Sequence, residues 1–287
     1  MRAVEDLVAA ELREAVDPRV SDLGAAVAAK YGSASRAVLF YGSCLREQQL
    51  DGLMLDFYLI VSDYNAAYGG GWLTAANRLV PPNVFPFEAD GLTAKYAVLS
   101  VADFHRLSGP GTRSVSVWAR FAQPSRLVWA ANEEARKQAV AAVARAAPTL
   151  LWAAGEQPGE EPLALWRRAF ALTYSAELRA ERKTRAGSVV DVDPERYLRF
   201  AGPALEAARA IRAPRPGWGR RRAEGKALSV IRLAKASATF AGGVDYIAWK
   251  INRHAGTQIA IKPWQRRWPL LAAISLLPRL IRSGAIR

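Results

Sequence analysis

Cysteine is nearly absent from this 287-residue sequence, and long apolar runs are missing altogether. The single cysteine, Cys44, excludes an intrachain disulfide and fits a reducing compartment. No window approaches the roughly 20 apolar residues that a membrane-spanning helix needs. The N-terminus carries acidic residues and no apolar segment of the kind found in secretory signals. We therefore expect neither a transmembrane nor a secreted protein.

Acidic residues are scarce in the last quarter of the chain. Residues 211–287 hold 16 Lys and Arg against two acids, Glu224 and Asp245, whereas residues 1–210 hold 24 of each sign. The net charge of +14 therefore lies entirely in the C-terminal part. Such segregation points to a polyanionic partner: nucleic acid, an anionic membrane surface or a phosphorylated ligand. The alternative is a solvated basic face without a partner.

The hydrophobic content of 51% is enough for a substantial core. Helical patterning covers residues 3–30, and a helix broken by glycines precedes Pro81-Pro82. Short β-rich runs lie at 36–42, 53–61, 83–89, 93–100 and 125–130, and helices are expected at 132–155, 162–186, 194–212, 224–254 and 265–283. The pattern predicts an α+β protein: a mixed-sheet domain at 1–131, a helical domain at 132–262 and a C-terminal amphipathic helix at 263–287.

One carboxylate, Asp56, lies in the middle of the apolar run at 53–61. A carboxylate in a buried strand is costly unless it is paired, hydrogen-bonded or bound to a metal. The preceding run ends in Tyr41-Gly42-Ser43, where successive backbone N–H groups of a tight turn form a concavity suited to phosphate. Asp56 at the mouth of a cleft facing this turn would bind Mg²⁺.

This arrangement of strand, Gly-Ser turn, strand and Asp resembles the polymerase-β-like nucleotidyltransferase superfamily. That superfamily carries a second carboxylate two residues from the first, whereas Met54 and Tyr58 flank Asp56 here. The second metal ligand is therefore expected from Asp63, at the end of the strand, or from Glu88 on a later strand. Asp63 has an alternative role as the N-cap of the following helix.

The sequence resembles more closely the mitochondrial-type phosphatidate cytidylyltransferase family, the translocator assembly and maintenance proteins. The matching segments, in chain order, are Tyr41-Gly42-Ser43 with Gln48, Met54-Leu55-Asp56-Phe57 followed by Asp63, "KYAVLS" from Lys95, "ARFAQPSRLV" with Arg120, "LTYSAELR" with Glu177, and "KASATFAGGVDYIAWKI". The chain departs from the family where "YNAAYGGGW" replaces a histidine-rich helix. The resemblance implies a nucleotidyltransferase-like sheet domain.

The resemblance also implies a reaction: CTP and phosphatidate give CDP-diacylglycerol and pyrophosphate, with Mg²⁺ as cofactor. The nucleophile is an anionic phosphate monoester that needs no general base, which suits a chain with two histidines. The implied catalytic residues are Asp56, Asp63 and Lys95; the metal ligands Asp56, Asp63 and Glu88; and the nucleotide-binding residues Tyr41, Gly42, Ser43, Gln48 and Arg120. Lys95 has an alternative role as an exposed edge lysine.

The C-terminal segment 263–287 combines an apolar face at helical spacing with tryptophans and arginines and has no acid. These features are typical of a helix that lies in the headgroup region of a membrane. The predicted membrane-binding residues are Trp264, Arg266, Arg267, Trp268, Arg279 and Arg282. The alternative is a terminal helix that packs on the protein core.

The leading hypothesis is thus a cytoplasmic enzyme, peripheral on the inner face of a membrane, with CTP and phosphatidate as partners and no nucleic acid. Two alternatives remain. One is a soluble nucleotidyltransferase acting on RNA, a protein or a small molecule, and the other is a non-catalytic membrane scaffold of the same fold. The oligomeric state and the acyl-chain preference are left open.

Overall fold

In the computed structural model, which describes residues 1–45, 50, 52–112, 114–177, 189–239 and 263, five strands form one mixed sheet. The order across the sheet is β3-β4-β2-β1-β5; β2 and β4 are parallel and the other neighbours antiparallel. The strands are β1 (Ser35–Tyr41), β2 (Met54–Val61), β3 (Asn83–Ala89), β4 (Leu92–Ser100) and β5 (Ser125–Ala130). Each lies within one residue of a predicted β-rich run, so the predicted α+β class with a mixed sheet is confirmed.

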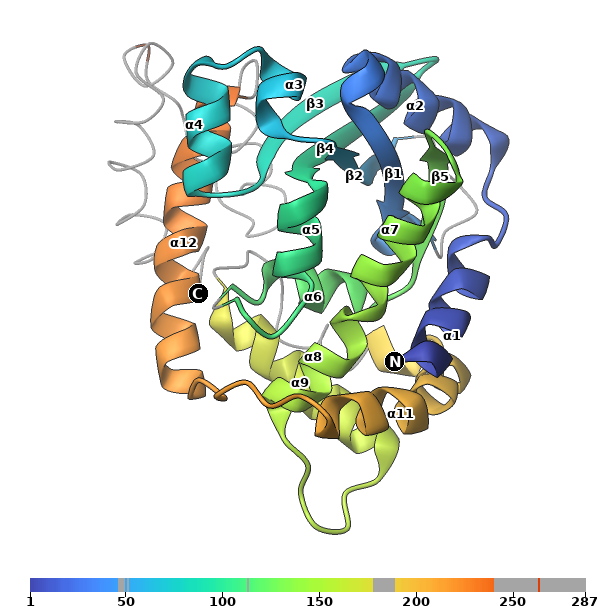
Figure 1. Cartoon of the computed structure of the whole chain (residues 1–287), viewed down its shortest axis with the longest axis vertical. Helices are drawn as coiled ribbons and strands as arrows, with labels where there is room; N and C mark the ends of the chain where they lie inside the picture. The colour runs from blue at the N-terminus through green and yellow to red at the C-terminus, as the bar shows by residue number, and fades with distance from the viewer. Residues whose placement is uncertain (46–49, 51, 113, 178–188, 240–262, 264–287) are drawn as a thin grey trace.

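Helices cover both faces of this sheet (Figure 1). They are α1 (Arg2–Leu12), α2 (Pro18–Ala29), α3 (Tyr64–Tyr68), α4 (Gly71–Leu79), α5 (Val101–Leu107), α6 (Ser116–Phe121), α7 (Glu133–Ala144), α8 (Ala146–Ala154), α9 (Pro162–Ala176), α11 (Pro194–Arg209) and α12 (Trp218–Thr239). The predicted helix at 3–30 is two helices, because Asp17 caps a new one whose first residue is Pro18. The helices α5 and α6 were not predicted, because they are too short to show a clear helical period in the sequence.

The two faces of the sheet bury different side chains because neighbouring residues of a strand point in opposite directions. Phe57 and Leu59 of β2 face a core completed by α2, whereas Tyr58 and Ile60 face a larger core built with α5–α9 and α11. Asp56 has the same parity as Tyr58, so it points towards the helical side. The candidate site therefore lies on that side of the sheet.

The larger core continues across the predicted domain boundary at 131/132. It contains Leu39 and Tyr58 from the sheet together with Leu150 and Trp166 from the helical half. A buried ion pair links Glu11 of α1 to Arg196 of α11, with Arg196 Nη2 3.1 Å from Glu11 Oε1. The two predicted domains thus share one core.

Among the described residues, no helix is both long enough and apolar enough to cross a membrane. The predicted tail at 263–287 lies outside the described residues except for Pro263. Gln48 and the six predicted membrane-binding residues also lie outside them, so their roles stay predictions. The last described helix, α12, leads towards this tail and runs past β3 and α9 along one edge of the molecule (Figure 1).

Candidate functional site

Three of the predicted site residues form a row across neighbouring strands. Asp56 on β2 pairs in register with Tyr41 on β1 and with Lys95 on β4, so all three side chains leave the same face of the sheet. Lys95 Nζ lies 2.8 Å from Asp56 Oδ1, and the two side chains are 24% and 20% exposed. The charge inside β2 is therefore balanced by Lys95, and the pair is still open to a ligand.

Gly42 brings the end of β1 against this carboxylate. Its φ of +99° is one that L-residues rarely adopt, and a Cβ added there would lie 3.1 Å from Asp56 Oδ2. The backbone then enters a short 3₁₀ turn, η2 (Ser43–Leu45), in which Leu45 N donates to Gly42 O at 3.3 Å. The predicted Gly-Ser turn and the predicted acid are thus neighbours in space.

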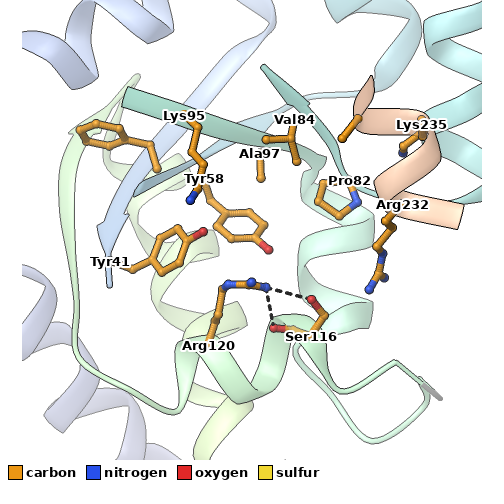
Figure 2. Close-up of a pocket in the computed structure, with 12 residues that line it drawn as sticks. Tyr41, Tyr58, Pro82, Val84, Lys95, Ala97, Ser116, Arg120, Arg232 and Lys235 are labelled. Carbon is orange, nitrogen blue, oxygen red and sulfur yellow. Dashed lines mark hydrogen bonds between the residues drawn. The ribbon is translucent and has the colours of Figure 1, made fainter. Parts of the chain in front are cut away.

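A pocket of about 150 Å³ opens beside the row (Figure 2). Its walls come from β1, β2, β4, the start of β3, α6 and α12. The lining residues are Tyr41, Phe57, Tyr58, Pro82, Val84, Lys95, Ala97, Ser116, Arg120, Arg232, Lys235 and Ala236. Small-molecule pockets usually measure about 300–1,000 Å³. This one is large enough for a phosphate group, and the rest of a nucleotide would extend beyond it.

Arg120 of α6, a residue that the family resemblance implies in nucleotide binding, lines the pocket. Its Nη1 donates to the Ser116 carbonyl at 3.2 Å and to Ser116 Oγ at 2.9 Å, and its guanidinium lies 5.7 Å from the centre of the Tyr41 ring. Burial lowers the pKa of Arg120, but the surrounding Tyr58, Tyr41, Glu177 and Asp56 outweigh this and raise it overall. Arg120 therefore stays positively charged in the pocket.

Tyr41 contributes a neutral phenol. Burial and the negative charge of Asp56 raise the pKa of Tyr41 well above its usual value. Its hydroxyl therefore keeps its proton at physiological pH and adds no negative charge to the pocket.

Two cations of α12, Arg232 and Lys235, complete the pocket, and the sequence analysis did not single them out. Arg232 Nε donates to Pro81 O at 3.1 Å and its Nη2 to Ser114 Oγ at 3.1 Å, while Lys235 Nζ donates to Val80 O. Burial, and then the charge of Arg232, lower the pKa of Lys235 to about 7. The available signal was the "KASATFAGG" segment, which begins at Lys235.

Asp63 does not meet Asp56 in the structure. Its carboxylate accepts hydrogen bonds from Asn65 N at 2.8 Å and Ala66 N at 3.0 Å and caps α3. Asp56 lies seven residues earlier on an extended strand, and this spacing separates the two residues by about 20 Å. One ion therefore cannot contact both carboxylates in this structure, and the N-cap alternative describes what Asp63 does.

Glu88 is also separated from Asp56. It is exposed on β3, where it pairs with Thr93, two residues before Lys95 on β4. Two strand spacings and a shift along the strand separate it from the carboxylate on β2. None of the three predicted metal ligands lines the pocket itself, and Asp56 lies next to it through its ion pair with the lining residue Lys95.

The residues present can nevertheless hold Mg²⁺ in one way. Mg²⁺ is often bound through one or two protein carboxylates, with water and substrate phosphates supplying its other oxygens. Asp56 Oδ2 faces the Gly42 turn, while Oδ1 lies against Lys95. A single carboxylate beside a phosphate-sized pocket fits a metal that arrives with a polyphosphate.

Comparisons with known proteins do not identify the chain. No family model matches it, and a search of curated proteins found no match.

Proposed function

We propose that this protein is a Mg²⁺-dependent nucleotidyltransferase that makes CDP-diacylglycerol and pyrophosphate from CTP and phosphatidate. The observation that carries the proposal is the Asp56–Lys95 pair against Gly42, at the mouth of a pocket lined by four cationic side chains. The family resemblance of the segments around these residues supplies the choice of CTP and phosphatidate. A Gly-Ser turn, an acid and fixed cations are the parts that transfer of a nucleotidyl group requires.

In the proposed reaction, a phosphate oxygen of phosphatidate attacks the α-phosphorus of CTP. The bond between the α-phosphorus and the bridging oxygen breaks, and pyrophosphate leaves with the bonding electrons. The main obstacle is repulsion between two anions, which Lys95 and Arg120 reduce by neutralising phosphate charge. Asp56 would hold Mg²⁺, which stabilises charge on the leaving pyrophosphate when bound. The turn at Gly42 and Ser43 positions the triphosphate.

The proposal is tested by incubating the full chain with labelled CTP, Mg²⁺ and vesicles containing phosphatidate, and by following both products. We expect CDP-diacylglycerol from the wild type and a loss of about 100-fold or more for Asp56→Asn, which keeps the shape and removes the charge. Lys95→Met should also lose activity, because it removes a cation that neutralises phosphate charge beside Asp56. Glu133→Gln is the matched control, because it removes an exposed carboxylate of α7 that does not line the pocket.

Three results would favour another function. Transfer of label to RNA, a protein or a small molecule without lipid would favour the soluble nucleotidyltransferase. CTP binding without any transfer would favour a non-catalytic scaffold, which the pairing of Asp56 with Lys95 also suits. Full activity of Asp56→Asn would remove the catalytic assignment.

A further inference from the structure

The pocket has two chemically different sides (Figure 2). On the strand side, Lys95, Tyr41 and Arg120 lie next to Asp56 and the Gly42 turn. On the α12 side, the cations Arg232 and Lys235 lie among apolar side chains. These apolar side chains are Pro82, Val84 and Ala236. A wall that combines positive charge with apolar surface suits a ligand with a phosphate and a hydrocarbon part.

Arg232 and Lys235 have donors beyond those that hold α12 in place. Their hydrogen bonds to the Val80 and Pro81 carbonyls fasten α12 to the end of α4. A guanidinium carries five N–H donors and an ammonium three, so each side chain can also donate to an anion. Both residues line the pocket. Fastening α12 and binding a ligand are therefore compatible.

The charges around the pocket favour a dianion. The facing groups are the cations Lys95, Arg120, Arg232 and Lys235 and the acids Asp56 and Glu177, with neutral Tyr41 and Tyr58 between them. On the α12 side alone, Arg232 and protonated Lys235 carry two positive charges, which match one phosphate monoester. A phosphodiester carries a single charge and would leave one cation unbalanced.

We propose that Arg232 and Lys235 form the subsite for the acceptor of the reaction, a phosphate monoester attached to an apolar group, while the Asp56–Lys95 side receives the nucleotide. This inference rests on the proposed function, and it assigns the two substrates to opposite walls. The acceptor would enter with its phosphate between the α12 cations and its apolar part against Pro82 and Val84. The division places the attacking phosphate across the pocket from the Gly42 turn.

Binding at this subsite is coupled to a proton. Lys235 has a pKa of about 7 in the free protein, and an adjacent dianion favours its charged form. Above pH 7, binding therefore takes up a proton, and the affinity for the monoester should fall by up to about tenfold per pH unit between pH 7 and 9. Lys235→Arg, which stays charged at every such pH, should bind with little pH dependence. A merely structural lysine would not produce this difference.

The experiment is calorimetric titration of the full chain with dioctanoyl phosphatidate below its micelle concentration, without nucleotide or metal. We expect Lys235→Met and Arg232→Met to weaken binding by about tenfold or more, and Lys226→Met, an exposed lysine on the same helix, to leave it unchanged. Affinity for CTP, titrated separately, should stay within about twofold. Thermal unfolding of each variant checks that the fold is retained.

Three further ligands show whether the subsite recognises the phosphate dianion, the apolar part or both. Inorganic phosphate and glycerol 3-phosphate supply the dianion without the apolar part, and dioctanoyl phosphatidylcholine supplies the apolar part with a phosphodiester. We expect phosphatidate to bind most tightly of the four. Equal binding of inorganic phosphate and phosphatidate would overturn the assignment of an apolar acceptor.

The outcomes also distinguish this inference from the proposed function. If the wild type makes CDP-diacylglycerol while the α12 variants bind phosphatidate normally, or lose CTP instead, the subsite is wrong and the function stands. If phosphatidate binds in a Lys235-dependent way but no CDP-diacylglycerol forms, the subsite stands and the function is wrong. A pH profile shared by wild type and Lys235→Arg would also contradict the subsite.

Discussion

At the scale of single residues, the site is defined by what surrounds one carboxylate. Asp56 lies between Tyr41 and Lys95 on neighbouring strands, with its second oxygen facing Gly42. The 2.8 Å contact with Lys95 explains how β2 tolerates a charge, and partial exposure of both side chains explains how a ligand could compete for them. Two substitutions test this account of the pocket residue by residue.

Gly42→Ala should lower both stability and activity. The alanine would adopt a strained φ, at a cost of about 1–2 kcal/mol in the free energy of unfolding, and its Cβ would press on Asp56 Oδ2. Gly91→Ala is the matched control, because Gly91 also has a positive φ but has nothing within 4 Å of the added Cβ. Urea denaturation should show similar losses for both variants, and only Gly42→Ala should lose transferase activity. Equal activity of the two would contradict the role given to the turn.

Lys235 should make stability depend on pH. Its pKa falls from the ordinary 10.5 to about 7 in the folded state, so the folded protein resists protonation that the unfolded chain accepts. The resulting loss in the free energy of unfolding is largest below pH 7. It decreases by at most about 1.4 kcal/mol per pH unit as the pH rises towards 10.5. Relative to Lys235→Met, the wild type should therefore gain free energy of unfolding between pH 7 and 10. A constant difference in denaturation experiments would show that Lys235 is not buried as the structure has it.

At the scale of elements, helix ends decide which acids are available to the site. Asp63 ends the loop after β2 and caps α3, so its carboxylate is occupied by two backbone N–H groups. The helix α4 ends at Leu79. The carbonyls of the next two residues accept hydrogen bonds from Lys235 and Arg232 of α12. Cations at a helix C-terminus are favourable for the same electrostatic reason that acids are favourable at an N-terminus.

Asp63→Ala should behave as the loss of a cap and not as the loss of a metal ligand. We expect a decrease of about 1 kcal/mol in the free energy of unfolding, with transferase activity close to that of the wild type. Asp63→Asn should recover most of the stability, because asparagine caps nearly as well as aspartate. Abolished activity in Asp63→Asn, with stability intact, would instead restore the predicted role in metal binding.

At the scale of the whole molecule, the site is assembled from distant parts of the chain. The pocket combines strands from the first hundred residues with α6 and α12. The shared core joins the sheet to α6–α9 and α11, and the buried pair of Glu11 with Arg196 joins α1 to α11. Removal of one partner of such a pair leaves an uncompensated buried charge. The contact between α1 and α11 should therefore be sensitive to single substitutions at Glu11 or Arg196.

A fragment of residues 1–131 should therefore fail to fold independently. Without α7–α12, the sheet face that carries Leu39 and Tyr58 would keep only α1, α5 and α6 and would lose the rest of the core that covers it. A fragment of residues 1–239 should keep the full core. Circular dichroism with urea denaturation should show a cooperative transition only for the longer fragment. Cooperative unfolding of the shorter one would restore the predicted boundary at 131/132.

The strands and the central carboxylate could be predicted from the residue pattern alone. Apolar runs bounded by turn residues predicted all five strands, because strand formation depends on local pattern and burial. The cost of an unpaired charge in such a run indicated Asp56, and the adjoining Gly-Ser turn predicted the side on which a phosphate would bind.

Which side chains lie next to Asp56 depends on how the strands and helices pack in the folded chain. Lys95 becomes its partner through the parallel register of β2 and β4. The length of β2 separates Asp63 from Asp56, and the order of the strands separates Glu88 from it. Arg232 and Lys235 line the pocket because α12 packs against the end of α4. A sequence shows the spacing of residues along the chain, but pairing across strands and helices brings together residues more than a hundred positions apart.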